Sequence, residues 1–116
     1  RDFVFVDDVA EGVLLAFEKA ADCTPINLGS GIGTTIKELI DIITSYIPGL
    51  NVRWDKGKPV GEDMRVLDIT RARGKIGYKP RISLKEGIGK TIEWYQENMD
   101  KLPQHYNVFH EKALIS

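Results

Sequence analysis

The sequence predicts an α/β fold in which short strands alternate with amphipathic helices. Short runs rich in β-branched and aromatic or other apolar residues occur at 3–6, 25–28 and 51–54, a pattern typical of strands. Apolar residues recur at helical spacing over 8–21, 36–47 and 84–95. A loop and a short helix separate the last strand from the last long helix, so the order of elements is the one typical of α/β proteins.

Capping signals predict where the helices begin and end. Three helices are expected to open on a cap residue that is followed three residues later by a glutamate: Asp8/Glu11, Thr35/Glu38 and Ser83/Glu86. Asp68 can cap the short helix, which is expected to end at Gly77. The helix at 8–21 is apolar over a wide arc, and we therefore expect it to be well covered.

Length and composition indicate one small domain. The chain has 116 residues, of which 42% are apolar and 28% charged, and its net charge is −1. This balance gives no electrostatic reason to expect nucleic acid or an anionic membrane as a partner. Cys23 is the single cysteine, which suits a reducing cytoplasm. Because the chain opens on arginine, we expect it to be part of something longer, with residues 1–100 forming one lobe and 101–116 a tail.

A polar loop at 54–68 interrupts the alternation of elements. It holds two glycines, Gly57 and Gly61, which allow a backbone to approach a ligand closely. It also holds Lys56, Lys58 and Arg65, and an arginine can grip phosphate oxygens with two parallel hydrogen bonds. We interpret the loop as one wall of a site for a phosphate-bearing ligand; the alternative is a solvated loop whose charges cancel.

The familiar catalytic signatures are missing from the sequence. The glycine run at 29–33 follows a predicted strand, but a dinucleotide fingerprint would need glycine at Thr34, so a tight turn is the better interpretation. None of the four tyrosines has a lysine four residues after it, and His105 and His110 both lie in the expected tail. The residues alone therefore predict binding and no particular reaction.

Several segments resemble, in order, those of one enzyme family. Residues 1–10 resemble the arginine-aromatic-valine-aspartate-aspartate segment of nucleotide-sugar epimerases and dehydratases, members of the extended short-chain dehydrogenase/reductase family. Residues 26–39 are similar to the next segment of that family, and 77–95 to a later one. Residues 58–68 most resemble the GDP-L-fucose synthase branch. The resemblance covers about residues 1–98.

The resemblance implies that the chain is the C-terminal substrate-binding lobe of an NAD(P)-dependent enzyme, with the Rossmann core mostly missing. The family's cofactor loop and its Ser/Tyr/Lys catalytic set lie upstream of the matching segments. The intact enzyme would use NAD or NADP, whereas this chain would bind no cofactor and would be inactive alone. Its partners would be a nucleotide-diphosphate sugar, the N-terminal Rossmann domain and, when intact, a second copy in a homodimer.

The resemblance also assigns the binding residues. Arg1 matches an arginine that contacts the nucleotide diphosphate, and Arg65 lies where the GDP-L-fucose synthase branch has a basic residue for the same phosphates. Lys58 matches a basic residue that opens the same loop. Asp7 and Asp8 match acidic positions with a structural role as helix caps.

Two further interpretations remain open. Within the enzyme class, a UDP-hexose 4-epimerase or a dTDP-glucose 4,6-dehydratase competes with a GDP-L-fucose synthase. In a different class, the chain would be a stand-alone nucleotide- or protein-binding module without chemistry.

Overall fold

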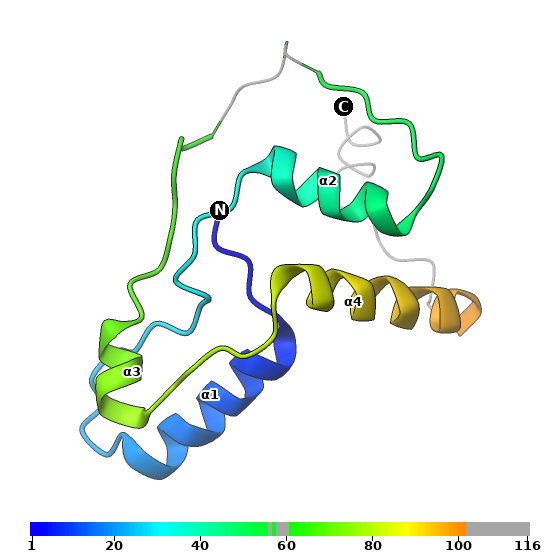
Figure 1. Cartoon of the computed structure of the whole chain (residues 1–116). Helices are drawn as coiled ribbons and strands as arrows, with labels where there is room; N and C mark the ends of the chain where they lie inside the picture. Colours follow the sequence, from blue (N-terminus) through cyan, green and yellow to red (C-terminus); the bar gives the residue numbers. More distant parts are fainter. Residues whose placement is uncertain (56, 58–60, 102–116) are drawn as a thin grey trace, which may run out of the picture.

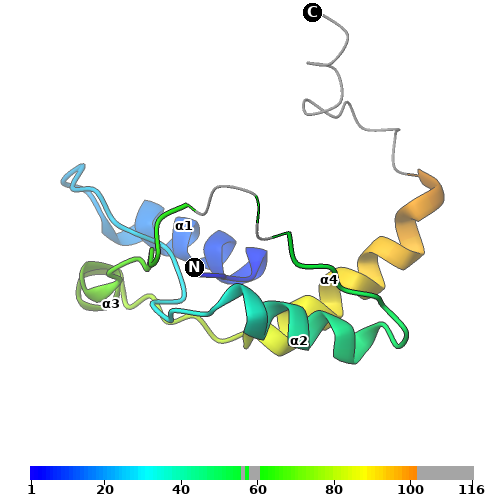
Figure 2. The ribbon, with the colours of Figure 1, turned by 90° about the horizontal axis from the view of Figure 1, so that it is seen from above.

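The computed structural model describes residues 1–55, 57 and 61–101 and is helical in this part of the chain. Its helices, in chain order, are α1 (Val6–Lys19), α2 (Ile36–Tyr46), α3 (Thr70–Ile76), α4 (Leu84–Asn98) and the 3-10 helix η1 (Met99–Lys101). Helix α1 packs beside α3, and α2 packs beside α4 (Figure 1). Figure 2 shows the same two pairs from above. The expected tail at 102–116, with its two histidines, lies outside the described residues.

The three predicted strands do not form within the described residues. The described residues contain one isolated antiparallel bridge, between Asp2 and Gly33, and both residues lie outside the expected strands at 3–6, 25–28 and 51–54. The first segment instead runs directly into α1, which begins at Val6. A strand is stable only beside neighbours that accept and donate its backbone hydrogen bonds. The three segments neither pair with one another nor become fully buried, and Val6 and Trp54 are 67% and 54% exposed.

The core lies between α1 and α3. Its buried members are Ile69, Ala72, Ile76 and Tyr78, against which side chains of α1 and of the 26–28 segment pack. The Tyr78 hydroxyl donates a 3.1 Å hydrogen bond to the carbonyl oxygen of Gly29, and burial raises the pKa of this phenol. Gly12 faces this core so closely that an added Cβ would lie 2.9 Å from the Tyr78 ring. The core therefore fixes α1 against the turn that begins at Gly29.

Asp8 does not cap α1, contrary to the sequence prediction. The N-cap residue is Phe5, which makes no side-chain cap hydrogen bond, and Asp8 lies inside the first turn with 3% of its surface exposed. Its carboxylate accepts hydrogen bonds from the backbone N–H groups of Arg81 (2.9 Å) and Ile82 (3.1 Å). Asp7, in the same turn, is exposed. Asp8 thus joins α1 to the segment that leads into α4.

The other predicted helix ends are formed, except that the N-cap of α3 is Ile69 and not Asp68, whose carboxylate accepts a 2.8 Å hydrogen bond from the Thr70 N–H. Thr35 and Glu38 make the reciprocal capping box of α2, as predicted. At α4, Ser83 accepts a 3.2 Å hydrogen bond from the Glu86 N–H. Helix α3 ends at Gly77, whose φ of +72° is the left-handed conformation that glycine adopts readily.

One face of α1 is exposed, which corrects the expectation that this helix is well covered. Phe17 is 91% exposed, Leu14 64% and Val13 56%. The helix buries the side that carries Gly12 and Ala16 and leaves the rest of its apolar arc in solvent. No helix in the described part of the chain is both long and apolar enough to cross a membrane.

We expect the isolated chain to self-associate through this apolar face of α1. Phe17→Ser should lower the association constant measured by analytical ultracentrifugation, because contiguous exposed apolar surface favours association. Glu18→Ser is the matched control, since Glu18 is also exposed and its loss removes no aromatic surface. A chain that stays monomeric at all concentrations, with a sharp cooperative melt, would contradict the expectation.

Candidate functional site

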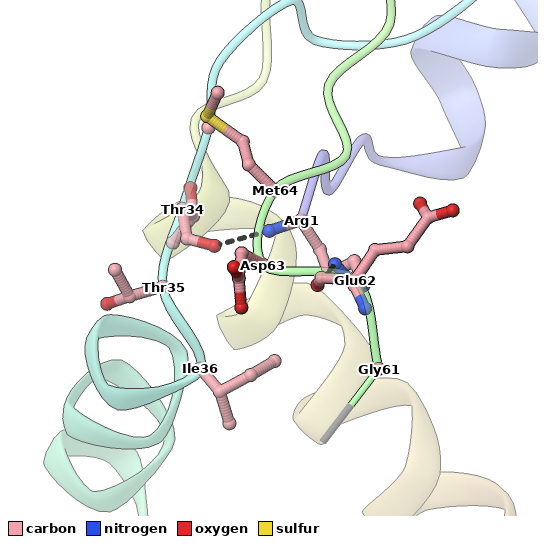
Figure 3. Close-up of a pocket in the computed structure, with 9 residues that line it drawn as sticks. Arg1, Thr34, Thr35, Ile36, Gly61, Glu62, Asp63 and Met64 are labelled. Atoms are coloured by element: carbon pink, nitrogen blue, oxygen red, sulfur yellow. Dashed lines mark hydrogen bonds between the residues drawn. The ribbon is translucent and has the colours of Figure 1, made fainter.

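A cavity of about 450 Å³ opens where the amino terminus, the start of α2 and the 61–64 segment meet (Figure 3). It is lined by nine residues from these three elements: Arg1, Gly33, Thr34, Thr35, Ile36, Gly61, Glu62, Asp63 and Met64. Part of the polar loop predicted from the sequence therefore forms one wall of a cavity, and Arg1 lies within that cavity.

Hydrogen bonds hold Arg1 to both walls of the cavity. Its backbone nitrogen donates to the Thr34 carbonyl (2.7 Å), and the Thr34 N–H donates back to the Arg1 carbonyl (2.9 Å). Across the cavity, the Arg1 guanidinium Nη1 donates to the Glu62 carbonyl at 2.6 Å. A Cβ added at Gly61 would lie 3.1 Å from Nη2, so the guanidinium rests against the loop backbone. Arg1 is thus positioned at the point where turn and loop converge.

Asp2 also holds the glycine turn and the loop together, a role that the sequence analysis does not assign to it. Its Oδ1 accepts from the Ser30 N–H (2.8 Å) and hydroxyl (2.5 Å), and its Oδ2 accepts from the Gly31 and Leu67 N–H groups (both 3.1 Å). Burial opposes ionisation of Asp2, but these hydrogen bonds outweigh it and lower its pKa below the usual 3.8. The stabilisation from these bonds is therefore fully present above about pH 4 and is lost as the pH falls through the lowered pKa of Asp2.

The structure describes one of the other two predicted binding residues. Arg65 is described and exposed, and it is not among the residues that line the cavity. Lys58 lies outside the described residues, as does Lys56. The structure thus brings Arg1 to the cavity with the predicted loop, and the diphosphate contacts of all three basic residues stay predictions.

Acidic residues contribute strongly to the charge of the cavity. Glu62 and Asp63 line it, and Arg1 is the basic residue among the lining nine. In Figure 3 the Glu62 carboxylate points away from the start of α2, whereas that of Asp63 points toward it. An anion bound here would be attracted by Arg1 and opposed by Asp63, so a diphosphate would need further cations for net attraction.

The glycine turn at 29–33 does not fit a dinucleotide pyrophosphate. A phosphate-binding turn of that kind offers free backbone N–H groups to the ligand. Here the N–H groups of Ser30 and Gly31 already donate to Asp2. The part of the chain that the structure describes also contains no group of three or more His, Cys, Asp or Glu residues able to hold a metal. With the Ser30 and Gly31 N–H groups engaged by Asp2, the turn does not present them to the phosphates of a cofactor.

The chain is similar to known enzymes over most of its length. The probable GDP-L-fucose synthase 1 of Oryza sativa subsp. japonica is 35% identical over 101 residues, which are 85% of this chain and 30% of that protein. Among solved structures, the UDP-glucose 4-epimerase of Thermotoga maritima, determined with UDP-glucose, is 37% identical with a TM-score of 0.74. The match covers 85% of this chain and 32% of that one. The Bordetella bronchiseptica enzyme WbmF, in complex with NAD+ and UDP, is 30% identical with a TM-score of 0.64, over 87% of this chain and 30% of that one. No family model matches the chain.

These similarities confirm the resemblance seen in the sequence motifs. GDP-L-fucose synthases and UDP-glucose 4-epimerases both match over 82 to 87% of the chain, and the chain spans only 27 to 34% of their length. The T. maritima UDP-glucose 4-epimerase matches over 85% of this chain and 32% of its own, so the helical arrangement seen here is part of the fold of that enzyme. The chain is therefore a homologue of GDP-L-fucose synthases and UDP-glucose 4-epimerases over 27 to 34% of their length, as expected of a member of the epimerase/dehydratase family.

Proposed function

We propose that this chain is the C-terminal, substrate-binding lobe of an NAD(P)-dependent nucleotide-sugar epimerase or reductase similar to GDP-L-fucose synthase. In the intact enzyme Arg1, Arg65 and Lys58 bind the diphosphate of the nucleotide sugar. The Rossmann domain supplies the cofactor site and the catalytic residues, and the lobe alone is inactive. We place the enzyme in the cytoplasm as a homodimer.

One observation carries the proposal: Arg1 is held inside a cavity against the loop that we interpret, from the sequence, as one wall of a phosphate-binding site. The 2.6 Å bond to the Glu62 carbonyl engages one guanidinium nitrogen. Because a guanidinium has five N–H donors, it can hold this carbonyl and still bind phosphate oxygens. The acidic Asp63 in the same cavity explains why one arginine would not suffice and why we assign further cations to the loop.

A UDP-hexose 4-epimerase is the second candidate. The observation in its favour is the fold: the structure of the T. maritima UDP-glucose 4-epimerase matches at 37% identity. The match to the rice GDP-L-fucose synthase covers the same share of this chain at 35% identity. The two candidates therefore share the proposed diphosphate site and differ in the base and the sugar of their substrates.

Calorimetric titration of the intact enzyme with UDP, GDP and NAD(P)H tests the proposal. We expect tight binding of one nucleoside diphosphate, and we expect Arg65→Ala to weaken it about tenfold to a hundredfold, because a charge-assisted hydrogen bond contributes about 1.5–3 kcal/mol. Arg65→Lys should recover part of the loss, since one ammonium cannot make a two-pronged contact.

The cofactor serves as the control in the same titration. Binding of NAD(P)H should hardly change in either variant, because the cofactor would lie on the Rossmann domain. If Arg65→Ala leaves the affinity for nucleoside diphosphate intact, the loop is a solvated surface loop and Arg65 is not part of the site.

A further inference from the structure

The carboxylate of Asp2 connects three segments that are far apart in the sequence. Its four hydrogen bonds reach Ser30 and Gly31 in the glycine turn and Leu67 near the end of the 54–68 loop, 28 to 65 residues away. The turn continues into one wall of the cavity, and the 61–64 part of the loop is the other wall. Asp2 is therefore placed where a single side chain sets the separation of the two walls.

The glycines around Asp2 show that this arrangement is tightly fitted. A Cβ at Gly29 would lie 2.8 Å from Asp2 Oδ2 and 2.8 Å from the Leu67 Cδ1 atom. Gly31 has a φ of +70°, and a Cβ there would lie 3.1 Å from the Ile69 side chain. The turn approaches Asp2 closely because it has no side chains at these two positions.

We propose that Asp2 is a positioning residue for nucleoside-diphosphate binding: it fixes the glycine turn and the 61–67 segment at the distance at which the adjacent Arg1 guanidinium faces the ligand. The inference rests on the proposed function and adds a residue that does not touch the ligand. Arg1 and Asp2 are neighbours, so the same short segment presents the cation and sets the spacing of the walls.

The same contacts also occupy the oxygen atoms of the Asp2 carboxylate. An ionised carboxylate beside a diphosphate site would repel the ligand and would compete for the arginine. Here both carboxylate oxygens are occupied by four donors from the turn and from Leu67. The Arg1 guanidinium, in turn, bonds to a carbonyl of the loop. Asp2 can therefore organise the site without neutralising its cation.

Titration of the intact enzyme with UDP and GDP, with NAD(P)H as the second ligand, tests the role of Asp2. We expect Asp2→Ala to weaken nucleoside-diphosphate binding about tenfold while the cofactor affinity changes less than about twofold. Asp2→Asn, which keeps one acceptor oxygen, should recover part of the loss. Gly29→Ala keeps the carboxylate but pushes it away from Leu67, so it should weaken binding in the same selective way, and it decides the matter if Asp2→Ala does not fold.

Asp8→Asn is the matched control. Asp8 is also a carboxylate that accepts backbone N–H groups, but it joins α1 to residues 81 and 82 and is not among the residues that line the cavity. Its substitution should lower the melting temperature and leave the nucleoside-diphosphate affinity unchanged. If the wild-type enzyme binds neither UDP nor GDP, the proposed function fails and the role of Asp2 fails with it. If the wild type binds and Asp2→Ala and Gly29→Ala bind equally well, or lose cofactor affinity in parallel, the role of Asp2 alone is overturned.

Discussion

Asp8→Ala should cost the fold about 3 kcal/mol, the largest loss of stability that we expect from any single side chain described here. The substitution leaves the N–H groups of Arg81 and Ile82 without their acceptor at a site where Asp8 itself is 3% exposed. An unsatisfied buried polar group costs about 1–3 kcal/mol, and the two N–H groups left behind are part-buried. The melting temperature should fall by about 10 °C or more, because 1 kcal/mol corresponds to about 4–8 °C in a domain of this size.

Circular dichroism during thermal and urea unfolding measures this loss, in dilute solution to limit self-association. Asp7→Ala is the matched control, since it removes the same charge from the same helical turn at an exposed position. It should cost less than about 1 kcal/mol, the range of a carboxylate's interaction with a helix N-terminus. Equal losses in the two variants would show that the contact from Asp8 to residues 81 and 82 does not hold α1 in place.

The contrast between Asp8 and Thr35 shows which parts of the fold the sequence could predict. Thr35 and its partner Glu38 are three residues apart, and this local capping box was predicted and is formed. Asp8 has the same local signal, but its partners are 73 and 74 residues away, and the long-range hydrogen bonds replaced the local cap. Local patterns cannot reveal such partners. The exposed face of α1 and the unpaired segments at 3–6 and 25–28 were missed for a related reason, because a local pattern does not show whether the described residues include a surface that covers or pairs with them.

In the candidate site, too, some residues could be predicted from the sequence and others could not. Arg1 and the loop could be assigned together because the family motifs mark both, and the structure places Arg1 and residues 61–64 at one cavity. Asp2 lies inside the same motif, yet its role depends on contacts with Ser30 and Leu67 that sequence order does not show. A useful sign would have been the glycine turn itself, since a tight turn leaves backbone N–H groups that need an acceptor.

Arg1→Ala should weaken nucleoside-diphosphate binding by the intact enzyme about a hundredfold, the largest functional effect that we expect. The substitution removes a charge-assisted contact to phosphate, which contributes about 1.5–3 kcal/mol. It also removes the 2.6 Å bond to the Glu62 carbonyl, so the loop loses one of its ties to the amino-terminal segment and the acidic Asp63 is no longer balanced by a cation within the cavity. Both effects act in the same direction, which is why the loss should exceed that of the more exposed Arg65.

Arg71→Ala is the matched control for calorimetry with UDP, GDP and NAD(P)H. Arg71 also donates to a backbone carbonyl, that of Pro25 at 2.7 Å, but it lies on α3 and is not among the residues that line the cavity. It should leave nucleoside-diphosphate affinity unchanged, and neither variant should alter the affinity for the cofactor. The nucleoside-diphosphate affinity of Gly61→Ala should lie between those of Arg1→Ala and Arg71→Ala. Its added Cβ would press on the Arg1 guanidinium at 3.1 Å and displace the charge without removing it. An Arg1→Ala enzyme that binds the nucleoside diphosphate as tightly as Arg71→Ala would place the diphosphate elsewhere and leave this cavity without its proposed ligand.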